Sequence, residues 1–315
     1  MNVPSRARFL ATGVALGTMR ASAASAQSLT HISVIAVPID ISAAPFYALD
    51  EGIFKKHGLD AEVSQLGNGA QVLAALVAGK VDFGAGGTAS VALAHERGLP
   101  IVMVAPSGAY SSAIRSHGLV VPADSPIRNP KDLNGKTIAT AGLKTLGDVA
   151  LHAWFAKTGV DAASVKLIEM PYGTMLASLS GGRVDAADLE VPYLDLALSQ
   201  GARFMANVFD AIAPEWIEGA FFCTLDYAKA HPDVVKRFGD AIAEAGVWAK
   251  NNPAEAWKVL DKYTKTTTPP GRPHVVFPER LRAADIQPAI DAMAKYGLLQ
   301  KAFPAKELFA PGVGD

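Results

Sequence analysis

The chain has 315 residues, of which half are hydrophobic, and its 29 basic and 30 acidic side chains leave a net charge of −1 at neutral pH. This balance argues against a basic stripe for nucleic acid, and Cys223, the only cysteine, excludes an intrachain disulfide. The length predicts a globular protein of about two domains that is stabilised by packing alone.

The first 26 residues are typical of a secretory signal peptide. Arg6 and Arg8 precede an apolar run over 9–19, and the small residues Ala24-Ser25-Ala26 follow. We therefore predict a signal peptide over 1–26 and export to the periplasm by either the general or the twin-arginine route. The apolar run is too short to span a membrane, and no nearby cysteine could carry a lipid anchor, so the mature protein is expected to be soluble.

The next segment alternates between strand and helix patterns. The expected strands are 32–37, 61–66 and 81–85, and the expected helices are 45–57, 71–78 and 89–97. Pro45 can open the first of these helices, and Gly79 ends the second. Strands that alternate with helices at this spacing predict a parallel sheet with helices on both faces.

The same layout returns about a hundred residues later, which predicts a second lobe. Residues 174–185 resemble residues 71–82 at an offset of 103, with a basic residue before Val-Asp in each copy. The matched positions are Leu73, Leu76, Gly79, Val81, Asp82, Ala94 and Gly98 with Leu176, Leu179, Gly182, Val184, Asp185, Ala197 and Gly201. Matches in one element order favour two lobes over a single sheet whose halves are similar by chance.

The domain organisation follows from this repeat. We expect residues 27–115 to begin lobe 1, residues 116–220 to form lobe 2, and residues 221–315 to return to lobe 1 and add C-terminal helices. The apolar runs 118–121 and 219–224 are expected to be strands that cross between the lobes and form a two-strand hinge. Helices are expected over 232–250, 254–263 and 284–296, packed against the first lobe.

Several landmarks together resemble a known family. They are residues 50–59, residues 76–82 with Gly84, residues 132–136, residues 182–186, Pro192-Tyr193, and His231-Pro232 before a long helix. In order and spacing the chain is similar to the periplasmic binding proteins of ABC importers for sulfonates, nitrate, taurine and thiamine-pyrimidine precursors. The resemblance implies an α/β, type II periplasmic-binding-protein fold that holds a small-molecule ligand between its lobes. It also implies a permease in the inner membrane as partner, a monomer, and no cofactor.

Ligand contacts are expected in the loops that follow the strands, because the crevice of an open α/β sheet lies beyond the carboxyl ends of its strands. Glycine-rich helix starts at Gly87-Thr88 and at Lys144-Thr145 could attract an acidic group, and Lys144 could pair with it. Alternatively, Thr88 is a helix cap and Lys144 a surface lysine.

Acidic residues in the same loops favour a ligand that also donates hydrogen bonds, and aromatic residues there could form the walls of the pocket. Asp40 and Glu190 could each receive an amine or a ring N–H, or could be a helix cap or a solvated hinge contact. The full set of expected ligand-binding residues is Asp40, Ser42, Asn68, Gln71, Gly87, Thr88, Lys144, Thr145, Tyr172, Glu190 and Tyr193. Arg272 and His274 lie in a proline-rich loop that could reach the rim of the cleft.

The sequence lacks the patterns of an enzyme. No two of the seven histidines stand at i,i+4, no nucleophile elbow or P-loop occurs, and Cys223 lies in an apolar run typical of an inert packed thiol. We therefore predict a periplasmic solute-binding component of an ABC importer for a small organic anion or zwitterion. The alternatives are a neutral heteroaromatic ligand such as a thiamine-pyrimidine precursor, a desulfinase-like enzyme on the same fold, or a receptor that signals instead of transporting.

Overall fold

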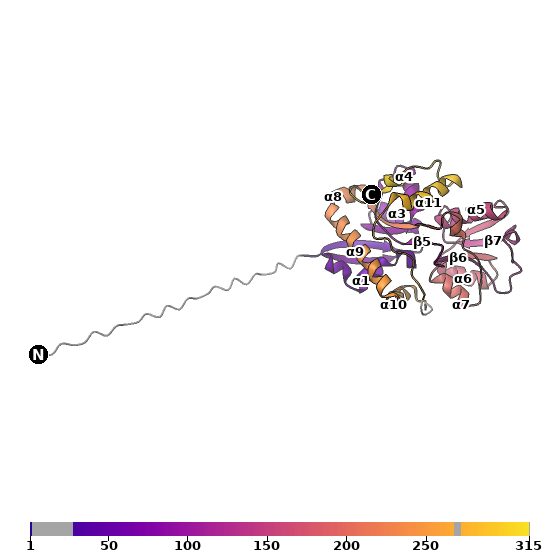
Figure 1. Ribbon diagram of the computed structural model, residues 1–315, viewed down its shortest axis with the longest axis horizontal. Helices are drawn as coiled ribbons and strands as arrows, with labels where there is room; N and C mark the ends of the chain where they lie inside the picture. The colour runs from indigo at the N-terminus through magenta and orange to yellow at the C-terminus, as the bar shows by residue number, and fades with distance from the viewer. Residues whose placement is uncertain (2–27, 268–271, 315) are drawn as a thin grey trace.

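Two sheets of five strands, each covered by helices, form two lobes with a small third sheet between them (Figure 1). The computed structural model describes Met1, residues 28–267 and residues 272–314. The predicted signal peptide therefore lies outside the described residues apart from Met1, and so do Pro269, Pro270 and Gly271 of the proline-rich loop.

The first lobe has the strand order β2-β1-β3-β12-β4. Strands β1 and β2, and β1 and β3, are parallel, whereas β12 is antiparallel to both of its neighbours. The strands are β1 (Thr30–Ala36), β2 (Leu59–Gln65), β3 (Phe83–Gly87), β4 (Ile101–Pro106) and β12 (Gly219–Thr224). The connecting helices are α1 (Ala44–Asp50), α2 (Ile53–Lys56), α3 (Gly69–Val77) and α4 (Thr88–Glu96), with a 3-10 turn at Asp40–Ser42.

The second lobe has the corresponding strand order β8-β7-β9-β6-β10. Here β7 is parallel to β8 and β9, and β6 is antiparallel to β9 and β10. The strands are β6 (His117–Val121), β7 (Thr137–Thr140), β8 (Lys166–Glu169), β9 (Ala186–Glu190) and β10 (Arg203–Ala206). The helices are α5 (Leu146–Thr158), α6 (Tyr172–Ser180) and α7 (Tyr193–Ser199), with 3-10 turns at Pro130–Leu133 and Val208–Ala211.

The sequence repeat has a structural basis. Helices α3 and α6, and strands β3 and β9, begin and end 103 residues apart. The repeated aspartates accept a hydrogen bond from the backbone of β1 or β7, from Ser33 N to Asp82 and from Thr137 N to Asp185, both at 2.8 Å. The repeated Gly79 and Gly182 have φ angles of 66° and 67°, a left-handed conformation that glycine adopts without strain.

Two expectations about the elements are wrong. The helix predicted over 45–57 is broken, because Gly52 adopts φ 70° between α1 and α2. The apolar runs 118–121 and 219–224 do not cross between the lobes: β6 lies inside the second sheet and β12 inside the first. The chain crosses instead at β5 (Ala109–Ser111) and β11 (Glu215–Ile217), which pair antiparallel as a separate two-stranded sheet.

The C-terminal helices are α8 (Leu225–Ala230), α9 (Pro232–Asn251), α10 (Pro253–Thr264) and α11 (Ala283–Lys295), followed by a 3-10 turn at Ala305–Leu308. Three of them, α9, α10 and α11, lie close to the predicted bounds, and α8 was not predicted. Helix α9 packs against α1 and α2 in the first lobe, where Phe238 stacks on Phe83 with ring centroids 4.0 Å apart. Helix α11 also contacts α5 of the second lobe, so the C-terminal region touches both lobes.

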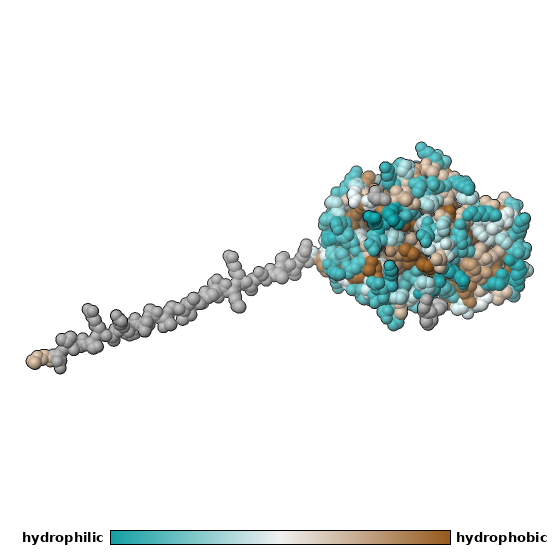
Figure 2. Space-filling view, in the orientation of Figure 1, coloured by the Kyte–Doolittle hydropathy of each residue, from teal (hydrophilic) through white to brown (hydrophobic). Residues whose placement is uncertain are grey.

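Hydrophilic residues cover most of the face in Figure 2, and hydrophobic residues form only small patches on it. Among the described helices, none is both long and apolar enough to cross a membrane.

Candidate functional site

A cavity of about 100 Å³ lies between the two lobes, and both lobes and the crossing segment line it. Its walls include residues at or just after the carboxyl ends of β1, β3, β7 and β9, together with residues from the first turns of α3, α4 and α5. In both lobes these are carboxyl ends of parallel strands, where a crevice is expected. One water needs about 10–15 Å³ on this scale, so the cavity has space for a small molecule.

Three helices begin in the cavity wall, and the sequence dictates how each one starts. The Asn68 side chain caps α3 by accepting a hydrogen bond from Gln71 N at 3.0 Å. The Thr145 hydroxyl caps α5 more weakly, at 3.5 Å from Asp148 N, and donates to the Gly142 carbonyl at 2.7 Å. Gly87 begins α4 with no side chain, so the backbone there lies open to the cavity.

Six of the eleven expected residues line the cavity: Ser42, Asn68, Gly87, Thr145, Tyr172 and Glu190. The Ser42 hydroxyl donates to the Val37 carbonyl at 2.6 Å, and the Tyr172 hydroxyl donates to Glu190 at 2.7 Å. These partners hold both side chains in place. Contact between a ligand and these residues stays a prediction.

The two residues expected to attract an acidic group are not in the cavity wall. Lys144 adopts φ 60° and donates its backbone N–H to Asp148, and its exposed side chain lines a separate outer groove beside α4 and α5. Thr88 is fully buried and is not a helix cap, since its hydroxyl donates to the Ile217 carbonyl at 3.3 Å and joins α4 to the crossing strand.

Three other expected residues do not line the cavity and have structural partners instead. Asp40 is buried, pairs with His274 Nδ1 at 2.6 Å and accepts a hydrogen bond from Val275 N at 2.8 Å. The exposed Gln71 side chain accepts from Gly67 N at 3.1 Å. Tyr193 stacks on Tyr172 with ring centroids 5.5 Å apart and lines an outer groove rather than the cavity.

Sequence reasoning missed polar residues of the cavity wall, namely Asp188, Glu218 and Thr140. Asp188 and Glu190 occupy alternate positions of β9 and so share one face of the strand, a pattern that could have indicated both. Glu218 is an acidic residue within an otherwise apolar run, and this pattern could have indicated it as a cavity residue next to the crossing strand β11. Gly147 is required beside them, because a Cβ there would lie 2.9 Å from Asp188 Oδ2.

Burial controls the charge state of these acids. It raises the pKa of Glu190, although His117 and the Tyr172 hydroxyl act in the opposite direction. Burial also opposes the charged form of His117, but Asp188, 3.1 Å away, outweighs this effect and the pKa of His117 is raised. The imidazole of His117 therefore pairs with one of the buried carboxyl groups of the cavity wall.

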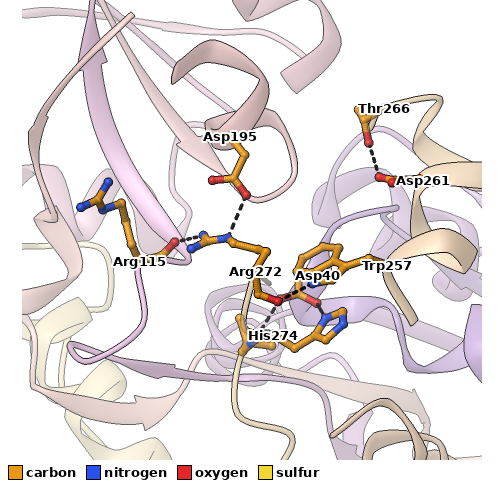
Figure 3. Close-up of polar contacts among 9 residues, drawn as sticks. Asp40, Arg115, Asp195, Trp257, Asp261, Thr266, Arg272 and His274 are labelled. Carbon is orange, nitrogen blue, oxygen red and sulfur yellow. Dashed lines mark hydrogen bonds and ion pairs between the residues drawn. The ribbon is translucent and has the colours of Figure 1, made fainter. Parts of the chain in front are cut away.

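A C-terminal segment links the lobes beside the cavity (Figure 3). Arg272 Nε lies 2.8 Å from Asp195 Oδ2 of the second lobe, and the Arg272 guanidinium also donates to the Arg115 carbonyl. His274 anchors the segment to the first lobe through Asp40, and Trp257 stacks on the His274 ring at 4.0 Å. Arg272, which was expected to reach the rim of the cleft, thus forms an ion pair between the lobes and does not line the cavity.

The chemistry of a nucleophile or metal is not apparent in this region. Cys223 is fully buried in β12, and burial raises the pKa of its thiol to about 12, the opposite of an activated cysteine. Within residues 28–267 and 272–314, no group of three histidine, cysteine or acidic side chains could hold a metal ion.

Curated proteins that resemble the chain in sequence are binding proteins. The chain is 26% identical to the taurine-binding periplasmic protein of Escherichia coli over 64% of this chain and 63% of the relative. It is also 26% identical to the formylaminopyrimidine-binding protein of Halalkalibacterium halodurans over 68% of this chain and 64% of the relative. The chain thus spans less than two thirds of the length of these two curated relatives.

Solved structures share the fold. The alkanesulfonate-binding protein of Xanthomonas axonopodis pv. citri, bound to MOPS, superimposes with a TM-score of 0.74 at 21% identity, over 89% of this chain and 98% of that one. The desulfurization enzyme DSZB superimposes with a TM-score of 0.63 at 15% identity, over 90% of this chain and 97% of that one, so the same fold also carries an enzyme. These likenesses confirm the predicted α/β fold of the periplasmic binding proteins. The model of the NMT1/THI5-like family matches residues 41–256, and the chain therefore belongs to that family.

Proposed function

We propose that the protein is the solute-binding component of an ABC importer, and that it captures a small organic molecule between its two lobes. The observation that carries this proposal is the cavity whose wall both lobes build. A ligand in that position contacts both lobes at once, and only a ligand with higher affinity for the closed form drives closure. The names of the relatives, which bind taurine and formylaminopyrimidine, support a small solute.

The remaining parts of the proposal follow from the sequence. Export by the signal peptide over 1–26 places the protein in the periplasm, where a monomer delivers its solute to a permease in the inner membrane. Binding without catalysis is favoured over a desulfinase-like activity because the Cys223 thiol is buried in β12 and its pKa is raised to about 12.

A thermal-shift screen of the full chain tests this function. The compounds are taurine, alkyl sulfonates, nitrate, aminopyrimidines, carboxylates and small amines. A solute at a hundred times its dissociation constant adds about 2.7 kcal/mol of stability, which corresponds to roughly 5–10 °C in a protein of this size.

A variant that fills the cavity serves to locate the site. At Gly87 an added Cβ would lie 3.7 Å from Leu146 Cδ1, an ordinary contact, so Gly87→Leu should fold and occupy cavity space. Gly173→Leu is the control, since nothing lies within 4 Å of an added Cβ at that exposed position of α6. We expect at least one solute to stabilise the natural protein and Gly173→Leu but not Gly87→Leu. Absence of any hit, or equal shifts in all three proteins, would refute the proposal.

A further inference from the structure

The cavity wall contains three carboxyl groups with too few partners. Asp188 and Glu190 belong to β9, and Glu218 lies between β11 and β12. Asp188 pairs with His117, and Glu190 accepts a hydrogen bond from Tyr172. Glu218 is only 6% exposed, and its carboxyl group has no hydrogen-bond or ionic partner among the described residues. A buried carboxyl group in this state is costly unless something else satisfies it.

A second unpartnered group in the same wall is independent of the acids. Thr140, the last residue of β7, is 1% exposed and lines the cavity. Its Oγ1 atom makes no hydrogen bond with any residue that the structure describes. A neutral hydroxyl and a carboxyl group that are both left unsatisfied in the wall of one cavity indicate that the wall is built for a polar ligand.

The charges of the wall decide which polar group fits. No lysine or arginine is among the described residues that line the cavity, and the imidazole of His117 already pairs with Asp188. Burial raises the pKa of Glu218 well above its usual range, and Glu190 and Asp188 raise it further. A cation placed against Glu190 and Glu218 would favour their ionised forms and pair with them, whereas an anionic group would require both carboxyl groups to stay protonated.

We propose that the solute carries a protonated amine, which donates hydrogen bonds to Glu190 and Glu218 with the Thr140 hydroxyl as a further acceptor. This inference rests on the proposed solute-binding function and names the chemical class of the solute. The starts of α3, α4 and α5 elsewhere in the wall can accommodate an acidic group of the same molecule, so simple amines and amine-bearing zwitterions share this recognition.

Matched pairs of probes test the amine directly. They are taurine and ethanesulfonate, β-alanine and propionate, and propylamine and propanol, each titrated calorimetrically into the full chain at neutral pH. We expect the amine-bearing member of at least one pair to bind about tenfold or more tightly than its amine-free partner, as a charge-assisted hydrogen bond allows. The first two pairs report on zwitterions and the third on a simple amine.

The outcomes separate this inference from the proposed function. If an amine-free solute binds equally well or better, and Gly87→Leu abolishes its binding, the amine is refuted while solute binding stands. If none of these probes and none of the screened solutes binds, both are refuted.

Glu218→Gln tests the carboxyl group itself, with Glu215→Gln as the matched control at an exposed position of β11. The first variant should weaken binding of the amine-bearing probe by about tenfold or more, and the second should leave it unchanged. Because Glu218→Gln removes a buried acid, the empty variant should unfold at the same or a higher temperature, which separates lost binding from lost folding. Equal affinity of the two variants would refute the assignment.

Discussion

The ion pair between Asp195 and Arg272 should favour the closed form, and Asp195→Asn removes it. Both side chains are about nine-tenths buried, at 11% and 12% exposed, and they lie on different lobes. Exposed ion pairs contribute about 0–1 kcal/mol, whereas breaking a buried pair costs about 3–5 kcal/mol. Arg272 keeps its hydrogen bond to the Arg115 carbonyl and can be hydrated when the lobes open. We therefore expect the substitution to destabilise the closed form by about 2 kcal/mol, a value between these limits.

This change should appear in the affinity for solute, since binding selects the closed form. A loss of 2 kcal/mol corresponds to roughly thirtyfold weaker binding. The affinity is measured by titration calorimetry, with the solute that gives the largest shift in the thermal screen. Asp285→Asn is the control, because it breaks the Arg282–Asp285 pair, which is 2.7 Å long and lies at the start of α11. Affinity within twofold of the natural protein for Asp195→Asn, or an equal loss in the control, would show that this pair does not govern closure.

Three further predictions concern the buried groups. Cys223, with a pKa of about 12, should be almost entirely protonated at pH 8 and should react with a thiol reagent only in denaturant; rapid labelling of the native protein would contradict its burial. Phe238→Ala removes the buried ring that stacks on Phe83 and should lower the free energy of unfolding in urea by about 3–5 kcal/mol. The control Val247→Ala, on the exposed side of α9, should lower it by less than about 0.5 kcal/mol. The pKa of His117 is raised in the folded state, so protonated His117 stabilises the fold fully below its unfolded pKa near 6.5, and this stabilisation is lost as pH rises through its folded pKa. His117→Gln should therefore make the free energy of unfolding less dependent on pH in this range. An unchanged pH dependence would contradict the pairing with Asp188.

The repeat made much of the fold predictable. Helices α3 and α6 follow from apolar positions at helical spacing that end at a glycine, and the same glycine-basic-Val-Asp order marks both copies. The crossing strands were missed because β5 and β11 have only three residues each, too few for a periodic pattern. The runs chosen in their place, β6 and β12, are apolar because they are buried inside the sheets.

The candidate site was predictable only where it depends on local structure. The helix starts at Asn68, Gly87 and Thr145 could be located because cap residues and glycines mark them. The direction of Lys144 depends on a left-handed turn, and the partner of Asp40 comes from a residue more than two hundred positions away. No local pattern carries that information, so both residues were assigned to a cavity that they do not line.

Small-angle X-ray scattering of the full chain tests most directly whether the lobes close around a solute. Profiles are compared without solute and at saturation with the compound selected in the thermal screen, with Gly87→Leu as the control. The account predicts a smaller radius of gyration for the natural protein with solute and no change for Gly87→Leu. A radius of gyration that stays the same in the natural protein at saturation would contradict closure of the lobes as the means of capture.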